Sequence, residues 1–265
     1  IDFPKRVKNT PISELGITGL ANGLALRGMI PFVEIMFGDF STLIVDQILN
    51  GSVKFKKMFG GQIECPIKIR MPMGAGGGYG PTHSQSLEKL FLTIDGLDVL
   101  AINRLIDPIE IYKKTLISNK PTLIIEHKSD YTKSFNLTKM TNNTFLISNE
   151  NYPTVVAKPR KRKPDTTIFT YGANIETAFN LQTKLFMKEE KFAQIVIFSK
   201  ISDISKYILN MFVDQVTEVI VIEDGTPKHG WGSDLIANIS CLGVQNIKFS
   251  RLGAKSHIIP ASFQL

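Results

Sequence analysis

The sequence predicts an α/β protein in which two domains are built around mostly parallel sheets. Short β-branched runs alternate along the chain with longer segments of helical periodicity, which is the pattern of consecutive βαβ units. The length of 265 residues suits two medium-sized domains. Asn, Thr, Lys and Pro are frequent in the middle of the chain, which is the composition of a connector. We therefore expect a first domain at 1–135, a connector at 136–165 and a second domain at 166–265.

The first domain is expected to open with a helix near Ser13, because serine is well suited to cap a helix N-terminus. Residues 1–9 carry no strand pattern, although a parallel sheet normally has more chain before its first helix. We therefore expect an N-terminal part of this domain to be missing from the sequence. Strands and helices then alternate, with strands at 32–36, 67–71, 99–102 and 122–126 and helices at 40–57, 84–93 and 107–118.

The second domain continues the same alternation after residue 165. Its apolar, β-branched runs predict strands, and the longer segments between them have helical periodicity. The predicted strands are 167–171, 193–198, 218–222 and 246–249, and the predicted helices are 173–188, 203–212 and 231–241. No internal repeat of the length found in solenoid proteins is present.

Composition argues against several classes of protein. No apolar run approaches the roughly 18 residues that a membrane-spanning helix needs, so we expect no membrane partner. Cys65 and Cys241 have no paired spacing, which argues against a disulfide framework or a zinc site. This cysteine usage favours a reducing compartment, the cytoplasm or, in a eukaryote, the mitochondrial matrix.

The formal net charge of +7 raises nucleic-acid binding as an alternative. Much of the excess comes from one run, residues 158–163, which contains one proline and is followed by another. A lone basic run of this kind is usually a solvated connection. No helix-turn-helix, RNA-recognition or zinc-finger signature accompanies it, so we expect no nucleic-acid partner.

Two stretches are candidates for chemistry. The glycine-rich run 74–80 leads to His83 at the start of a helical pattern, and glycine at this density marks special dihedrals or a close approach. Glu14 lies in the first turn of the first expected helix. Both residues have simple structural alternatives, since a carboxylate complements the helix dipole and a histidine near a helix start is often just partly exposed. The sequence has no GxxxxGK[ST], GxSxG or HExxH motif, and the glycines do not follow the Rossmann GxGxxG pattern.

A family resemblance changes the weight of these candidates. It is carried by "TPISELGITGLANGLALRGMIPFVEIMFGDFSTLIVDQILNGSVKFKKMFGGQ" and "IRMPMGAGGGYGPTHSQSLEKLF", and it continues through "NKPTLIIEHKSDY", "TIFTYGANIETA", "VIVIEDGTPKHGWGSDL" and "RLGAKSHIIP". In this order the segments resemble the β subunit of the thiamine-diphosphate-dependent 2-oxo acid dehydrogenases, of the pyruvate and branched-chain type. The resemblance implies a transketolase-like fold, with a pyrimidine-binding domain followed by a transketolase C-terminal-like domain.

The resemblance also implies roles for residues near the start of the chain. In this family a carboxylic acid in a TP-x-x-E stretch contacts the aminopyrimidine ring of thiamine diphosphate, and the matching residue is Glu14. Ile12 is expected to line the pyrimidine pocket. Phe40 matches the aromatic position that stacks on the pyrimidine, with Met36 nearby. By the same resemblance, the glycine-rich loop brings His83 to the active-site channel, where an imidazole can exchange a proton during acyl transfer to lipoamide.

The resemblance implies a shared active site. Thiamine enzymes hold the diphosphate through Mg²⁺, on a GDG motif followed some distance later by Asn-Asn, and this sequence lacks that arrangement. We therefore expect an α subunit that supplies the diphosphate and Mg²⁺ half of the site, and no metal ligands in this chain. The family further implies a β–β dimer and a lipoyl-bearing acyltransferase partner. A structural potassium site is common near Ile67 in this family, but Ser118 and Lys120 stand where an acid and an Asn are usual, so we assign no ion there.

Two alternatives remain open from the sequence. One half of a split transketolase or deoxyxylulose-phosphate synthase-like enzyme would share the fold, but that family usually has G-x-x-E-Q before its helix and lacks "GPTHSQS". A non-catalytic scaffold homologue would keep the fold without turnover. The presence of Glu14, Phe40 and His83 together argues against this second alternative.

Overall fold

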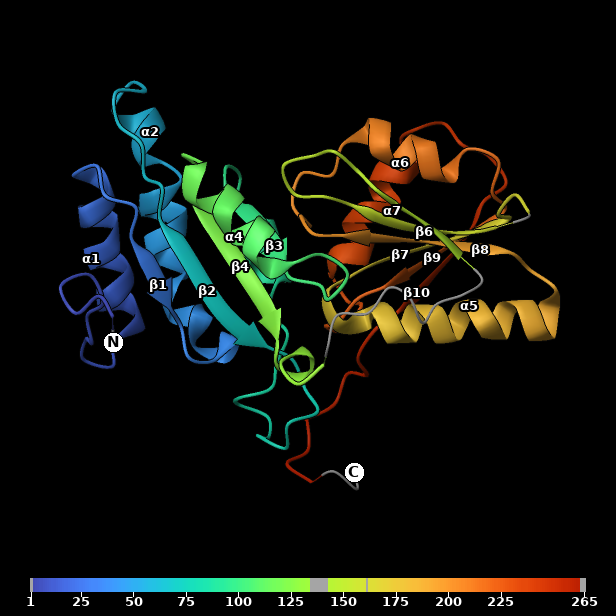
Figure 1. The fold of residues 1–265 in the computed structure, drawn as a ribbon, viewed down its shortest axis with the longest axis horizontal. Coiled ribbons are helices and arrows are strands. Elements are labelled where there is room, and N and C mark those ends of the chain that lie inside the picture. The colour runs from blue at the N-terminus through green and yellow to red at the C-terminus, as the bar shows by residue number, and fades with distance from the viewer. Residues whose placement is uncertain (1, 134–142, 161, 263–265) are drawn as a thin grey trace.

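The first domain is built on a four-stranded, fully parallel sheet. A computed structural model describes residues 2–133, 143–160 and 162–262. The strands lie in the order β1-β2-β4-β3 (Figure 1). Their bounds are Phe32–Glu34 for β1, Lys68–Met73 for β2, Asp98–Ala101 for β3 and Thr122–His127 for β4. The predicted α/β class is confirmed, and each strand end lies within two residues of its expected position.

Helix α1 (Glu14–Leu26) begins where the sequence predicts it, because the Ser13 side chain accepts a hydrogen bond from the Gly16 amide at 3.2 Å. After a short turn the chain enters β1, against which α1 packs, so the two run antiparallel. The start of α1 therefore lies at the edge where the parallel strands end. The other α-helices of this domain are α2 (Phe55–Met58), α3 (Lys89–Leu92) and α4 (Pro108–Ile117).

The segment 40–57 is helical, as predicted, but it is not one regular α-helix. The segment forms a 3-10 helix (Gly38–Ile44) and a π-helix (Gln47–Ser52) before α2. Asn22 of α1 donates from Nδ2 to the Gln47 carbonyl at 2.9 Å, and its Oδ1 accepts from Ser52 Oγ at 2.6 Å. These buried bonds engage a carbonyl that an α-helix would use for itself, and the wider π turn accommodates them. The helix expected over 84–93 is likewise reduced to α3.

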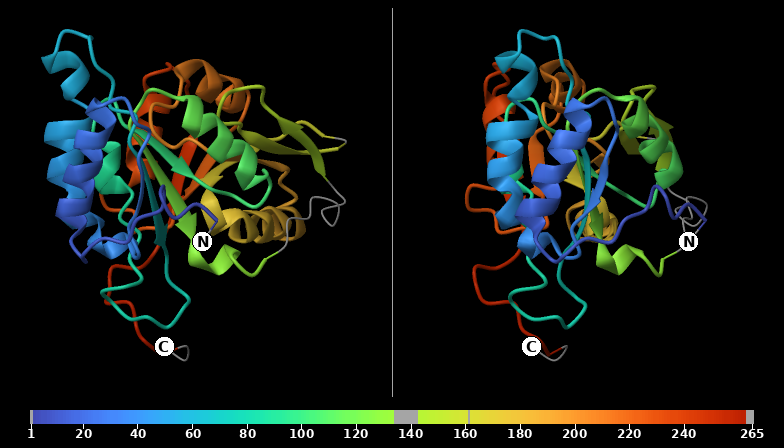
Figure 2. Two further views of the ribbon diagram at one scale, coloured as in Figure 1. Left: turned by 60° about the vertical axis from the view of Figure 1, so that its left-hand side comes forward. Right: turned by 90° about the vertical axis from the view of Figure 1, so that its left-hand side faces the viewer.

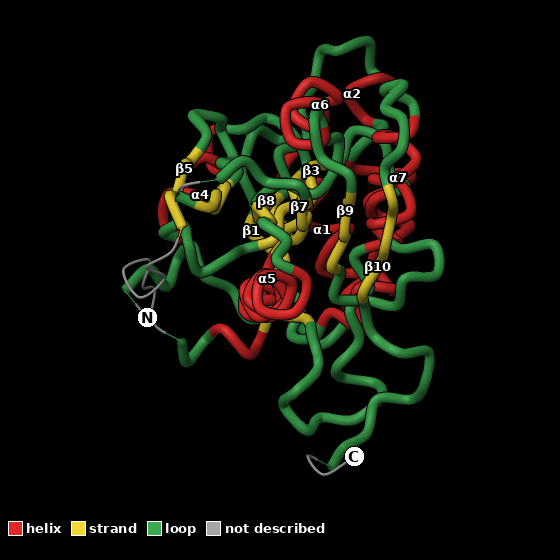
Figure 3. The backbone as a smooth tube through the Cα atoms, turned by 90° about the vertical axis from the view of Figure 1, so that its right-hand side faces the viewer, coloured by secondary structure: helices red, strands yellow, loops and turns green. Residues whose placement is uncertain are grey.

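The second domain contains a six-stranded mixed sheet in the order β10-β9-β7-β8-β6-β5. Its parallel part consists of β7 (Thr166–Tyr171), β8 (Ala193–Phe198), β9 (Glu218–Ile222) and β10 (Lys248–Leu252). Helix α5 (Ile175–Glu189) covers one face, and α6 (Lys206–Val213) and α7 (Trp231–Ser240) cover the other (Figures 1 and 3). The three helices lie close to their predicted positions.

The expected connector at 136–165 belongs in part to this sheet, which corrects the prediction. β5 (Asn143–Ile147) and β6 (Val155–Pro159) form an antiparallel pair, and β6 pairs with β8. As the edge strand, β5 leaves most of its side chains exposed, so polar residues are tolerated there and mask the strand pattern. The expected boundary at 135/136 and Lys161 of the basic run lie outside the described residues.

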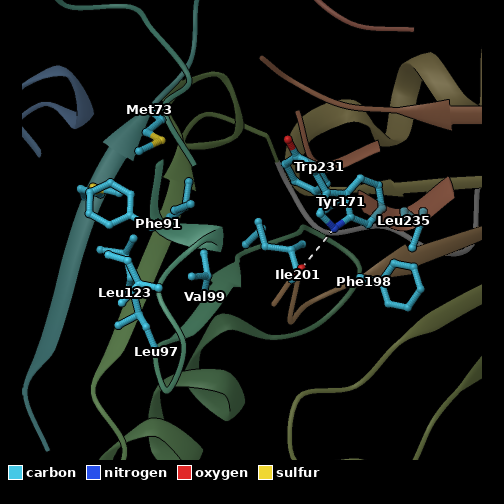
Figure 4. Packing of buried hydrophobic residues seen from close by; sticks show 14 of the residues in the cluster. Met73, Phe91, Leu97, Val99, Leu123, Tyr171, Phe198, Ile201, Trp231 and Leu235 are labelled. Carbon is cyan, nitrogen blue, oxygen red and sulfur yellow. Dashed lines mark hydrogen bonds between the residues drawn. The ribbon is translucent and has the colours of Figure 1, made fainter. Parts of the chain in front are cut away.

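The two sheets are joined through backbone hydrogen bonds and share hydrophobic cores. The Ala101 amide of β3 donates to the Ser199 carbonyl at 2.8 Å, and the Ile201 amide donates to the Val99 carbonyl at 2.9 Å. Figure 4 shows one core that continues across the junction, and the Trp231 indole donates to the Ile201 carbonyl at 3.1 Å. The labelled first-domain side chains in this core are Met73, Phe91, Leu97, Val99 and Leu123, and those of the second domain are Tyr171, Phe198, Ile201, Trp231 and Leu235.

Candidate functional site

The carboxyl ends of the strands in the first sheet gather the segments that carry most of the predicted site residues. Phe40 follows β1, the glycine-rich loop follows β2, and residues 127–130 come at and after the end of β4. In parallel α/β sheets, ligands bind outside this edge. The C-terminal segment runs beside the glycine-rich loop (Figures 1 and 2), and a β-carbon on Gly80 would lie 3.5 Å from that of Ala261.

The glycine-rich loop requires glycine at its first position for two reasons. Gly74 has φ +96°, in the region that side-chain-bearing residues rarely adopt. A β-carbon there would also lie 1.9 Å from Nε2 of His127. By contrast, Gly76 has φ +92° but no atom within 4 Å of the same position. The loop therefore starts in contact with the end of β4 and then leaves it.

The His83 ring lies in a cluster of aromatic rings. Its centroid is 4.8 Å from that of Phe37 and 5.3 Å from that of Phe40, with interplanar angles of 84° and 81°. These are edge-to-face contacts, which favour a fixed orientation of the ring. Nδ1 lies 2.9 Å from the Thr82 hydroxyl, so Nε2 is the nitrogen available to a bound molecule. The structure thus brings two predicted site residues, Phe40 and His83, into contact.

Lys128 completes this cluster from the end of β4. Its Nζ donates to the His83 carbonyl and lies 4.6 Å from the centroid of the Phe37 ring and 5.0 Å from that of Tyr79. Burial lowers the pKa of the Lys128 ammonium, and the Asp39 carboxylate opposes this effect. A positive charge is therefore held against rings and a carbonyl beside the candidate catalytic histidine.

Asp39 connects the same cluster to the residues after His83. Its Oδ1 accepts from the Gln85 amide at 3.2 Å and from Gln85 Nε2 at 2.9 Å. The residue is 7% exposed, and within the described part of the chain its Oδ2 has no hydrogen-bond partner. A buried carboxylate oxygen of this kind can accept a further hydrogen bond from a bound group.

Glu14, Ile12 and Met36 lie at the same edge but outside the ring cluster. Glu14 is the first residue of α1 and is half-buried, whereas Ile12 is 83% and Met36 is 56% exposed. Within residues 2–133, no hydrogen bond, ion pair or ring contact joins Glu14 to His83. α1 packs against the 3-10 helix that carries Phe40, so the two groups of residues share one wall. A carboxyl for hydrogen bonding, two exposed apolar side chains and an aromatic ring are the kinds of group that suit an aminopyrimidine ring.

Several residues of this site were not predicted from the sequence. Phe37, Tyr79 and Lys128 contact one another around His83, and His127 packs on Gly74. Their position in the sequence could have indicated them: "EHKSD" lies at the end of a predicted strand, and the carboxyl ends of neighbouring parallel strands meet at one edge. Within the described residues, no group of three or more His, Cys, Asp and Glu side chains could hold a metal ion, and no helix is long and apolar enough to cross a membrane.

Behind the glycine-rich loop, a buried polar network crosses between the domains. The Tyr171 hydroxyl donates to Glu88 Oε1 at 2.7 Å and accepts from the Asp224 amide at 3.1 Å. Asp224 accepts from Ser86 Oγ and lies 3.5 Å from His127 Nε2. Burial, reinforced by the Asp224 charge, raises the pKa of Glu88 to about 7. Burial alone would lower the pKa of His127, but the hydrogen bond to Asp224 and the charges of Asp224 and Asp130 together raise it.

Comparison with known proteins shows which family this chain belongs to. Residues 1–133 match the family described as the pyrimidine binding domain of transketolase. The beta-1 subunit of the mitochondrial pyruvate dehydrogenase E1 component from Arabidopsis thaliana is 31% identical over 236 residues, which cover 89% of this chain and 64% of that protein. The beta subunit of acetoin:2,6-dichlorophenolindophenol oxidoreductase from Cupriavidus necator is 31% identical over 235 residues, which cover 89% and 67%.

A solved structure titled "Split gene transketolase, inactive beta4 tetramer" has a TM-score of 0.71 over 96% of this chain and 76% of its own, at 20% identity, which is a likeness of fold. The chain spans about 64% of the length of the pyruvate dehydrogenase relatives from Arabidopsis thaliana and Oryza sativa. The matched domain, the relatives and the fold agree: this chain belongs to the transketolase-like family that includes the β subunits of 2-oxo acid dehydrogenases.

Proposed function

We propose that this chain is the β subunit of a thiamine-diphosphate-dependent 2-oxo acid dehydrogenase, which decarboxylates a 2-oxo acid and passes the acyl group to lipoamide. Family membership supports the reaction class. The observation that carries the proposal is the His83 ring, held between Phe37 and Phe40 at the carboxyl edge of a parallel sheet. A ring fixed in this way can present Nε2 repeatedly to the same position in a bound molecule.

Glu14, Ile12, Met36 and Phe40 would hold the pyrimidine end of the cofactor. When bound, thiamine diphosphate supplies a carbon nucleophile and stabilises the electron pair that stays behind when carbon dioxide leaves. The Glu14 carboxyl, half-buried at the start of α1, would hold a proton against the pyrimidine ring nitrogen. Phe40 supplies an aromatic face, and the exposed side chains of Ile12 and Met36 supply apolar contact.

His83 would move a proton during acyl transfer. The Thr82 hydroxyl lies 2.9 Å from Nδ1, so the proton would be exchanged at Nε2. A neutral imidazole is suited to this task because it takes up and releases protons near neutral pH. The Phe37 and Phe40 rings pack edge-on against the imidazole and would hold it in one orientation while the proton is exchanged.

An α subunit would complete the site, by holding the diphosphate through Mg²⁺. The surface beside Glu14 suits a protein partner, because α1 exposes Leu15 by 50%, Leu20 by 59% and Leu24 by 36%. Leu20 and Leu24 are four residues apart and therefore neighbours on one face of α1, and an exposed apolar surface of this kind is typical of a contact between subunits. The proposal also includes a β–β contact and a lipoyl-bearing acyltransferase, in the cytoplasm or the mitochondrial matrix.

Co-purification from the source cells tests the proposal directly. We expect native purification of this chain to recover a partner whose sequence has GDG and a downstream Asn-Asn. The reconstituted pair, supplied with thiamine diphosphate and Mg²⁺, should then decarboxylate a 2-oxo acid and acylate lipoyl domains. Recovery of this chain with itself only, and no turnover of any 2-oxo acid by it, would contradict the proposal and favour the scaffold alternative.

A further inference from the structure

The loop that carries His83 is held at both of its ends by two consecutive residues. At the first end, the His127 imidazole occupies the space where Gly74 would carry a β-carbon. At the other end, Lys128 Nζ donates to the His83 carbonyl. Of the loop residues between these ends, Ala75, Gly76 and Gly77 are exposed, and so is Tyr79 by 55%. Gly80 is buried beside Ala261, so the position of His83 depends on the contacts at the two ends of the loop and on this one near its second end.

Lys128 is well fixed as an anchor. Its ammonium lies against the Phe37 and Tyr79 rings, and Tyr79 belongs to the loop itself. Phe37 also contacts His83, with 4.8 Å between ring centroids. One side chain thus holds the His83 backbone, a loop tyrosine and the ring that orients the imidazole. Removal of the ammonium would release all three contacts together.

His127 extends the connection to the second domain. Its Nδ1 lies 2.8 Å from Ser129 Oγ and accepts from the Ser129 amide at 3.2 Å, which fixes the plane of the ring. Its Nε2 lies 3.5 Å from Asp224 Oδ1. Asp224 follows β9 and is itself held by Ser86 Oγ and, through its amide, by the Tyr171 hydroxyl. The start of the loop is therefore placed relative to a residue of the other domain.

We propose that His127 and Lys128 act as a two-point clamp that positions His83, and that Asp224 fixes this clamp relative to the second domain. Lys128 and His127 are positioning residues in this inference, since they act on His83 through its carbonyl, the neighbouring rings and Gly74. The catalytic meaning of the clamp rests on the role proposed above for His83. The clamp itself concerns only the position of the His83 ring, so it can be tested without measuring enzyme activity.

The imidazole NMR signals provide that test. The chain has four histidines, so each ring signal can be assigned by single substitution. The His83 signal should be displaced by the ring currents of Phe37 and Phe40. We expect Lys128→Met to move it toward the position of a free histidine, and Lys128→Arg to preserve most of the displacement. Lys113→Met is the matched control, because Lys113 lies on α4 with its side chain 67% exposed. An unchanged His83 signal in Lys128→Met would overturn the clamp.

Proteolysis gives a second measurement on the same variants. Chymotrypsin should cut after Tyr79 at least tenfold faster in Lys128→Met than in the wild type or Lys113→Met. If Lys128→Met does not fold, the second-domain variant Asp224→Asn is used instead. That variant should broaden or move the His127 signal and speed the same cleavage. Unchanged cleavage and an unchanged His127 signal in a folded Asp224→Asn protein would overturn the link to the second domain.

An activity measurement distinguishes failure of the clamp from failure of the role proposed for His83. In the reconstituted enzyme we expect Lys128→Met to lower kcat for acyl transfer to lipoyl domains at least tenfold, with little change in their KM, and Lys128→Arg to recover most of the rate. If the His83 signal moves while acyl transfer is unaffected, the clamp stands and the proposed role of His83 fails. If acyl transfer falls while the His83 signal does not move, Lys128 acts in another way and the clamp is wrong.

Discussion

The His83 imidazole lies edge-on to the Phe40 ring, with 5.3 Å between the ring centroids and 81° between their planes. Phe40 lies in the 3-10 helix after β1 and His83 in the loop after β2, and the family resemblance implied separate roles for them. Their contact means that the proposed pyrimidine-stacking residue and the proposed proton-transfer residue share one wall of the site. Changes at either position are expected to affect the other through ring packing.

Replacement of His83 by Ala should impair acyl transfer to lipoyl domains by about 10²-fold or more, because a positioned acid–base group is lost. Decarboxylation followed with an artificial electron acceptor should be affected much less. Both rates would be measured in the reconstituted enzyme. His257→Ala is the control, since His257 is exposed in the C-terminal segment. Equal losses in the two assays would place the role of His83 before acyl transfer.

Replacement of Glu14 by Gln should lower decarboxylation by about 10²- to 10⁴-fold, because the amide cannot hold the proton against the pyrimidine nitrogen. The side chain keeps its size, and the Ser13 cap of α1 is unchanged, so assembly should be preserved. Size-exclusion chromatography and the initial rate of carbon dioxide release check both expectations. Glu64→Gln, at an exposed ion pair with Lys56, is the control. A wild-type rate in Glu14→Gln would remove this residue from the mechanism.

Replacement of Gly74 by Ala should destabilise the protein far more than replacement of Gly76. The two glycines have similar dihedrals, with φ values of +96° and +92°, so backbone strain should destabilise each alanine variant by about 1–3 kcal/mol. At Gly74 the new methyl group would also meet His127 Nε2 at 1.9 Å, whereas nothing lies near Gly76.

Urea unfolding of the two variants measures the difference, which isolates the contact with His127. In a second step, His127→Ala combined with Gly74→Ala should recover much of the extra loss, because the clashing ring is removed. Equal stability of the two single variants would mean that the loop does not pack against His127.

The pH dependence of stability should show the buried carboxyl of Glu88. Its pKa is raised from 4.5 to about 7, so the folded state binds this proton more tightly than the unfolded state. The contribution of Glu88 is therefore fully favourable below about pH 4.5 and is lost as the pH rises to about 7. Glu88→Gln should remove this loss.

The free energy of unfolding of Glu88→Gln, relative to the wild type, should increase by up to about 3 kcal/mol between pH 4.5 and pH 7.5. His127 and Asp224 titrate in both proteins, so the comparison selects the Glu88 contribution. Glu110→Gln, whose carboxylate is 54% exposed, should show no such change. A difference between Glu88→Gln and the wild type that does not vary with pH would mean that Glu88 ionises normally in the folded protein.

The sequence predicted the elements whose pattern is local. The strand cores, the helices α4 to α7 and the Ser13 cap of α1 were found because apolar periodicity and capping chemistry act within a few residues. The helical character of 40–57 was predicted, but its division into 3-10, π and α turns was not, because a side chain from another element, Asn22, bonds to the Gln47 carbonyl and to Ser52. β5 was missed because a polar edge strand looks like a loop in sequence, and β6 because only three apolar residues, 155–157, lie between Pro153 and the basic run.

By itself, the sequence determined the α/β class, the order of the elements and the presence of a glycine loop that ends in a histidine. The tertiary structure alone decided which side chains hold that histidine: Phe37 and Phe40 through ring contacts, Lys128 through its ammonium and His127 through Gly74. The physical reason is that parallel strands bring their carboxyl ends to one edge whatever their separation along the chain. Periodicity and capping report what a segment forms with itself, and the contacts of His83 are made between segments.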